Sequence, residues 1–195
     1  RYEGPAGGTA TLDLPVAIAL DLSGDDAYEP GGAVLPAQGA GILGVGVLVD
    51  LDGDDRYAAE RHAQGCGQVG IGILYDAAGN DTYSANRSAQ GSAFFGAGLL
   101  LEAEGNDRYD LVGEGQGFGG AGGVGVLADR AGDDRYHAEP RAEGGADLRL
   151  DGTVEGSIAI RLPDSSRPPI PRPRRSRRSE VGASGTTSPG SACWA

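Results

Sequence analysis

The sequence predicts an all-β fold: a β-solenoid, parallel β-helix-like, with about 26 residues per coil. Three features that recur with one period carry this prediction. The first is a turn motif, G-(D/N)-D-x-Y, whose tyrosines are spaced by 26, 29, 26, 26 and 27 residues. The second is a Gln-Gly pair, and the third is a strand-like run that ends in an acidic residue. The motif tyrosines are Tyr2, Tyr28, Tyr57, Tyr83, Tyr109 and Tyr136, and the pairs begin at Gln38, Gln64, Gln90 and Gln116.

The strand-like runs have the period of a β-strand. In the run 44–50, "GVGVLVD", the residues Val45, Val47 and Val49 share one face, while the glycines and Leu48 share the other. Helices are disfavoured here, because each interior glycine costs a helix about 1 kcal/mol. Glycine on one face of a strand often marks the close approach of another backbone. We therefore expect two sheets that lie unusually near each other.

One repeat unit contains too few apolar residues to bury a core alone, so the units must stack on their neighbours. Units are expected at 2–28, 28–57, 57–83, 83–109 and 109–136, followed by a C-terminal cap of short strands at 137–162. The repeat domain is thus predicted to span 1–162. The remainder, 163–195, is rich in Pro, Arg and Ser and is expected to be a disordered tail.

The charge balance differs between these two parts. Residues 1–162 hold 26 acidic residues and 10 arginines, a net charge of −16, whereas residues 163–195 carry +4. The acidic body argues against nucleic acid as its partner and suits cations. No apolar run approaches the ~18 residues that a membrane span needs. The two cysteines, Cys66 and Cys193, lie far apart and do not indicate a disulfide framework.

Two acidic positions recur in every unit and are the candidate metal ligands. One follows the turn glycine by two residues, and the other precedes that glycine by three. Stacking would align their carboxylates in columns. The residues are Asp21, Asp26, Asp50, Asp55, Asp76, Asp81, Glu102, Asp107, Asp129 and Asp134.

The charge repulsion within such columns must be offset, because two like charges ~4 Å apart repel by ~1 kcal/mol in water and by ~4 kcal/mol at an effective dielectric constant of 20. Calcium is one candidate, since it takes six to eight oxygen ligands. Arginine is another: Arg56, Arg108 and Arg135 directly follow the paired acids. A solvated turn with Asx-type hydrogen bonds and no metal is the third.

The turn resembles half of the calcium-binding repeat of RTX (repeats-in-toxin) proteins, G-G-x-G-x-D-x-U-x. In "AAGNDTYSA" the matching residues are Gly79, Asp81 and Tyr83, and the other copies match at the same three positions. The resemblance implies that the aspartates and nearby carbonyls bind Ca²⁺ between coils. This chain departs from that family in lacking the leading Gly-Gly and in repeating every 26 or so residues rather than every nine.

The glutamine and tyrosine columns have structural and functional interpretations. The glutamines are expected to form a ladder of stacked amides, with a row of ligand-binding groups as the alternative. The tyrosines are expected to stack ring on ring, with a sugar-binding strip as the alternative.

An active site would require a departure from the repeat. The most site-like departure places Glu60, Arg61 and His62 beside Arg87 of the next coil, which suggests a β-helical enzyme or binding module for polysaccharide as an alternative function. No phosphate-binding loop, zinc cluster or nucleophile elbow is present in the sequence.

The sequence therefore predicts a structural or scaffold role. The chain begins inside a motif copy, at Arg1-Tyr2, and contains no methionine, so we expect a segment of a larger protein. The expected location is the outside or the surface of a bacterial cell. Self-association and carbohydrate are the partners that such a surface would suit.

Overall fold

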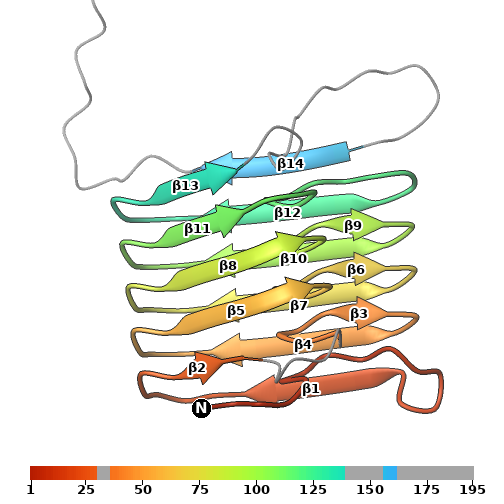
Figure 1. Cartoon of the computed structure of the whole chain (residues 1–195), viewed down its shortest axis with the longest axis horizontal. Coiled ribbons are helices and arrows are strands. Elements are labelled where there is room, and N and C mark those ends of the chain that lie inside the picture. The colour runs from red at the N-terminus through yellow and green to blue at the C-terminus, as the bar shows by residue number, and fades with distance from the viewer. Residues whose placement is uncertain (30–35, 139–155, 162–195) are drawn as a thin grey trace, which may run out of the picture.

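The computed structural model describes residues 1–29, 36–138 and 156–161, and within them every regular element is a β-strand (Figure 1). No helix in this part of the chain is long and apolar enough to cross a membrane. The predicted tail, 163–195, and most of the predicted cap lie outside the described residues. All strand pairs are parallel, as one strand per coil on each side requires.

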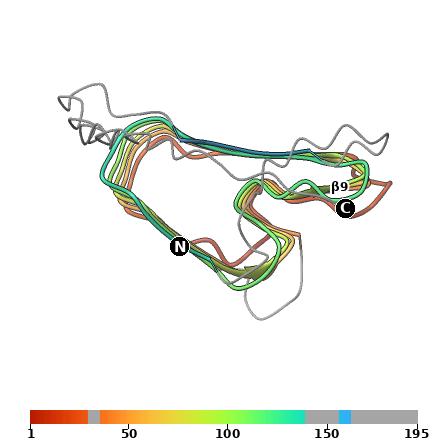
Figure 2. The same cartoon turned by 90° about the horizontal axis from the view of Figure 1, so that it is seen from above.

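The strands form three sheets, seen edge-on in Figure 2 as the sides of one coil. The six-stranded sheet has the order β1 (Val16–Leu20), β4 (Val45–Asp50), β7 (Ile71–Asp76), β10 (Ala97–Glu102), β12 (Val124–Asp129) and β14 (Gly156–Arg161). The five-stranded sheet has the order β13 (Arg135–Ala138), β11 (Arg108–Leu111), β8 (Thr82–Arg87), β5 (Arg56–Arg61) and β2 (Ala27–Tyr28). The three-stranded sheet consists of β3 (Gly41–Ile42), β6 (Gly67–Gln68) and β9 (Ala93–Phe94).

The register places each residue over its counterpart in the next unit. Asp50 pairs with Asp76 in the six-stranded sheet, and Tyr57 pairs with Tyr83 in the five-stranded sheet. The predicted β-solenoid of about 26 residues per coil is therefore confirmed. After the last complete repeat, β14 adds to β12 as one further parallel strand, the closing strand that the alternation of the cap predicts.

The core is a stack of like residues. Tyr28, Tyr57, Tyr83 and Tyr109 are fully buried beside a column of leucines that includes Leu48. Successive tyrosine rings lie 4.6–4.9 Å apart with interplanar angles of 2–8°. Each such contact stabilises the stack by about 0.5–1.5 kcal/mol beyond the burial of area. The predicted tyrosine ladder is confirmed, and because the rings are buried they do not form an exposed sugar-binding strip.

The strand glycines mark a close approach of backbone layers, as predicted. A Cβ on Gly46 would lie 2.2 Å from the carbonyl oxygen of Ala40, and one on Gly72 would lie 2.1 Å from that of Cys66. Both carbonyls belong to the segment that carries the Gln-Gly pair. The six-stranded sheet therefore packs directly against this segment with no side chain between them.

Gly72→Ala should destabilise the fold. The new methyl group would overlap the Cys66 carbonyl, and relieving such overpacking costs about 1–3 kcal/mol or more. Gly4→Ala is the matched control, because nothing lies within 4 Å of its added Cβ. Urea denaturation should show a clear loss for Gly72→Ala and a change within about 0.5 kcal/mol for Gly4→Ala. Equal midpoints for the two variants would contradict the close packing.

Candidate metal centre

The acid that ends each strand of the six-stranded sheet points into the coil. Period two places Asp50 on the same face as Gly46 and Leu48, and all three residues are buried or nearly so. Asp50 Oδ2 accepts from the hydroxyls of Tyr28 (2.6 Å) and Tyr57 (3.2 Å). The terminal acids therefore face the rim of the tyrosine stack.

The same contact recurs along the stack. Asp76 Oδ2 lies 2.7 Å from the Tyr57 hydroxyl and 3.2 Å from that of Tyr83, and Glu102 accepts from Tyr83 at 2.7 Å. Tyr57 thus lies between two carboxylates, Asp50 and Asp76. A phenol has a single proton to donate, so it cannot satisfy both carboxylates at once. The hydroxyls alone therefore leave the acidic column short of donors.

The paired acids of the turn bond to the backbone of the neighbouring coil. The amide of Asp55 donates to Asp81 Oδ1 (2.7 Å), and the amide of Asp81 donates to Asp107 Oδ1 (2.8 Å). At the Asp/Asn position before each paired acid, the hydrogen bond runs the other way along the stack. There the amide of Asn80 donates to Asp54 Oδ1 (2.8 Å) of the preceding coil. The Asx-type hydrogen bonding expected of the turn is therefore present, but it runs between coils.

The two acidic columns meet in three groups, within each of which the contributing oxygens lie within 4.8 Å of one another. The two columns come together because the repeats stack in register. These groups are Asp50–Asp55–Asp76, Asp76–Asp81–Glu102 and Asp107–Asp129–Asp134.

Each group contains buried oxygens that lack a partner. Five carboxylate oxygens in the three groups have no hydrogen-bond partner within the described part of the chain, although the residues that carry them are at most 2% exposed. Leaving a buried acceptor unsatisfied costs about 1–3 kcal/mol, and more when it is charged. The atoms are Asp50 Oδ1, Asp76 Oδ1, Asp81 Oδ2, Asp107 Oδ2 and Asp129 Oδ1.

Burial raises the pKa values of these carboxyl groups. Burial, with the charge of Asp76 as the next contribution, raises the pKa of Asp81 to about 8 and that of Glu102 to about 10. Burial likewise raises the pKa of Asp55 to about 8 and that of Asp107 to about 7. At neutral pH Asp55, Asp81 and Glu102 therefore favour a bound proton or a nearby cation over a bare charge.

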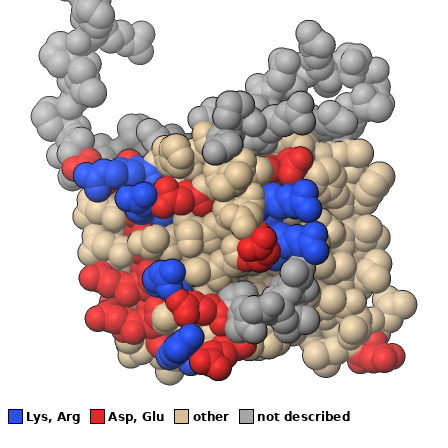
Figure 3. Space-filling view, in the orientation of Figure 1, with Lys and Arg blue, Asp and Glu red and all other residues tan. Residues whose placement is uncertain are grey.

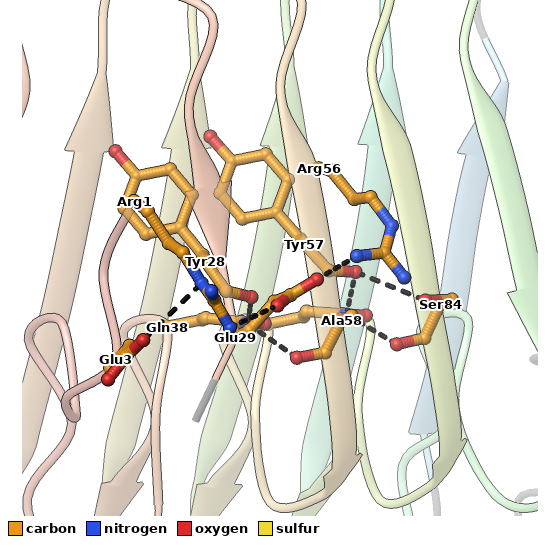
Figure 4. Close-up of polar contacts among 10 residues, drawn as sticks. Arg1, Glu3, Tyr28, Glu29, Gln38, Arg56, Tyr57, Ala58 and Ser84 are labelled. Carbon is orange, nitrogen blue, oxygen red and sulfur yellow. Dashed lines mark hydrogen bonds and ion pairs between the residues drawn. The ribbon is translucent and has the colours of Figure 1, made fainter. Parts of the chain in front are cut away.

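Neither Arg56 nor Arg108 offsets this charge. Arg56 and Arg1 both form ion pairs with Glu29 on the outside of the coil, as Figure 4 shows, and Arg108 pairs with Asp110. The reason is the alternation of the strand: the position after the buried aspartate faces outward. In Figure 3 many surface acids and arginines gather at the left, over the turns that lead into the five-stranded sheet, and a second group lies right of centre.

The three groups could hold a metal ion. Each offers hard carboxylate oxygens from three residues, the ligand type that Ca²⁺ and Mg²⁺ both take. Eight of the ten predicted ligands belong to a group. Asp21 and Asp26 belong to none among the described residues: Asp21 accepts from Tyr2 and Tyr28, and Asp26 pairs with the N-terminal amine of Arg1.

The glutamines bind backbone rather than one another. Gln38 Nε2 donates to the carbonyl oxygens of Tyr28 (2.7 Å) and Ala58 (3.0 Å), which belong to adjacent coils (Figure 4). Gln64 and Gln90 repeat the arrangement. The predicted glutamine column is therefore structural, but its amides join neighbouring strands of the five-stranded sheet and do not stack as an amide ladder.

The residues of the predicted polysaccharide site lie at the end of β5 and β8. Arg61 and Arg87 are register partners, and burial together with these two arginines lowers the pKa of His62. Glu60 is exposed, and no hydrogen bond or ion pair joins it to His62 among the described residues. The acid–histidine contact that would orient a general base is thus missing from this cluster, and catalysis there stays a prediction.

The tyrosine hydroxyls are functional groups that the sequence reasoning missed. A signal for them exists, since each terminal acid precedes the motif tyrosine of its own coil by seven residues, as in Asp50–Tyr57 and Asp76–Tyr83. A constant spacing between two residue types across a turn indicates that their side chains meet.

No protein-family model, curated protein or solved structure matches this chain. The β-solenoid and the close approach of its acidic groups are observed in the structure, while kinship with RTX proteins stays a prediction.

Tyr83→Phe should destabilise the protein by about 1–3 kcal/mol, because it keeps the stacked ring but removes the donor that Glu102 receives. Tyr75→Phe is the matched control, since Tyr75 lies on the outward face of β7. Urea denaturation of both variants measures the difference. An equal response of the two would show that the buried hydroxyl contributes nothing.

Stability in the presence of a chelator should fall as pH rises. The pKa values of Asp55 and Asp81 rise from 3.8 in the unfolded chain to about 8 in the folded protein, so the folded state binds more protons between these limits. Their contribution is complete below about pH 4 and is lost as pH rises through about 8. The melting temperature should therefore fall across this window in EGTA, and a rise would contradict the buried column.

Proposed function

We propose that this chain is a structural segment of a larger secreted or cell-surface protein, a stiff β-solenoid spacer whose buried carboxylate groups bind calcium. The observation that carries the proposal is the set of buried carboxylate oxygens in the three groups that have no hydrogen-bond partner among the residues the structure describes. A cation between coils would satisfy these oxygens and replace the repulsion of the columns with attraction.

Calcium suits these groups better than magnesium does. Mg²⁺ usually keeps several of its waters in near-octahedral geometry, whereas residues such as Asp76 and Glu102 are 0% exposed, so an ion bound by them would have to give up most of its water. Extracellular modules bind Ca²⁺ with dissociation constants of about 10⁻⁴–10⁻³ M, which the surroundings of a secreted protein can saturate. An extracellular location and calcium binding are therefore compatible parts of the proposal.

A spacer role fits the way in which the coils are joined. Backbone ladders, stacked rings, glutamine amides and turn carboxylates all connect each coil to the next. Every connection is repeated along the axis, so bending the stack would strain many of them together. Calcium would add a further set of crosslinks between coils.

Calcium should raise the stability of the full chain, and magnesium should raise it much less. A site-bound ion contributes RT ln(1 + [L]/Kd), about 2.7 kcal/mol at 100 times Kd. The measurement is the midpoint of urea or thermal unfolding at pH 7 in CaCl₂, MgCl₂ or EGTA, with isothermal titration calorimetry for binding.

A pair of Asp→Asn variants gives the matched control. Asp81→Asn keeps the Oδ1 acceptor for the Asp55 amide but removes a buried ionisable carboxyl group from the middle group, so it should stabilise the protein in EGTA and reduce the response to calcium. Asp54→Asn makes the same change outside the groups, at a position where Asn80 and Asn106 occur naturally, and should alter neither. Superimposed curves in calcium and EGTA, with no heat of binding, would overturn the calcium proposal.

A further inference from the structure

The outward face of the six-stranded sheet is apolar over its described side chains. Burial alternates along β4, β7, β10 and β12, with every second residue turned away from the coil interior. The outward positions contain no charged residue. They are Val16, Ile18, Leu20, Val45, Val47, Val49, Ile71, Ile73, Tyr75, Ala97, Leu99, Leu101, Val124, Val126 and Ala128.

The register assembles these residues into one continuous surface, hereafter the apolar face. Its central row contains Ile18, Val47, Ile73, Leu99 and Val126, each paired with the next. Ile18, on the outermost strand, is 69% exposed, and the other four residues of the row are half-buried. Sheets with one face in solvent usually carry polar residues on that face, and a strand that is apolar on both faces is typical of a sheet covered on both sides.

The area of the apolar face reaches the lower limit for a specific interface. Five strands spaced by about 4.8 Å and about 20 Å long give a footprint of roughly 450 Å² per copy. Leu22 and Leu51, 64% and 39% exposed, continue the alternation in sequence beyond two of these strands. With these leucines, two such faces would together bury about 1,000 Å², which is the lower limit for a specific interface.

The geometry of the sheet points to a second copy of this chain as the occupant. Tyrosine rings of successive coils differ by only 2–8° in orientation, so the coils stack almost without rotation and the sheet is nearly flat, its edge forming the long straight side in Figure 2. Flat sheets over many strands are unusual and are stabilised by side-chain ladders, such as the tyrosine stack, or by stacking on another sheet. A second copy presents a face of equal flatness and equal strand spacing, so rows of side chains can interdigitate along the whole stack.

The chain's own C-terminal segment is a poorer match. Residues 163–195 hold six arginines and two acidic residues and are rich in proline and serine. Burying these charges against an uncharged apolar face would be costly, because that face offers them no partners.

We propose that two copies of this chain associate face to face through the apolar face, with the sheets about 10 Å apart as in a β-sandwich. The contact is isologous, so Ile73 near the centre of one face meets the centre of the other. This inference goes beyond the spacer role and does not rest on calcium, because the apolar face contains no carboxylate.

Sedimentation equilibrium and small-angle X-ray scattering of the full chain test the proposal. The wild-type chain should form dimers at micromolar concentration, in EGTA as well as in CaCl₂. Scattering should show a particle doubled in thickness and unchanged in length along the coil axis. Dimers that double the length, or a chain that stays monomeric up to about 100 times that concentration, would overturn it. A monomer would leave the apolar face to a different partner.

Charged substitutions locate the contact. Ile73→Lys should weaken dimerisation at least tenfold, and Ile18→Lys should weaken it without disturbing folding, because Ile18 is 69% exposed within a single chain. Val112→Lys is the matched control: Val112 is 54% exposed but follows β11 of the five-stranded sheet, so its dimer should persist. Circular dichroism checks that each variant folds. A dimer unaffected by both Ile73→Lys and Ile18→Lys would refute the face-to-face contact.

Discussion

Successive coils of this chain lie one strand spacing apart, so the nearest neighbour of almost every side chain is its own counterpart in the next coil. Stacking identical side chains one strand spacing apart stabilises some residue types and destabilises others. Aromatic rings gain, as the 4.8 Å stacking of Tyr57 on Tyr83 shows. Carboxylates lose, since like charges repel most strongly where burial removes water. The rest of the structure can be understood as the consequence of this one constraint.

The chain manages the penalty by giving its acids different partners. The terminal acids face phenol hydroxyls, the paired acids accept amide protons from the coil before them, and the Asp/Asn position accepts from the coil after it. Each arrangement uses one oxygen of the carboxylate. The second oxygen is left over in five cases, and raised pKa values record how strongly the interior then favours a bound proton or cation over a bare charge.

The sequence was sufficient to predict the period, the register, the tyrosine stack and the close approach at the strand glycines, because each of these depends only on which residues recur together. It was insufficient wherever the direction of a side chain decides the partner. Gln64 reaches two backbone carbonyls and not another amide, and Arg56 turns outward to Glu29 and not inward to the acids. Both outcomes depend on the path of the backbone around the coil, which spacing does not encode. The seven-residue interval between acid and tyrosine is the exception, since it recurs without change.

The coil is thin, and this limits how many apolar side chains it can bury inside and leaves others on its outer surface. Where Gly46 and Gly72 touch carbonyls of the facing segment, no side chain can fill the space, so the interior gains apolar contacts mainly from the leucine and tyrosine columns. Every second residue of each strand points the other way, onto the apolar face. A single copy leaves part of that face in water, and each exposed Å² forgoes about 25 cal/mol. The proposed pairing of two copies would recover this free energy on the outer face, where the thin interior offers few apolar contacts of its own.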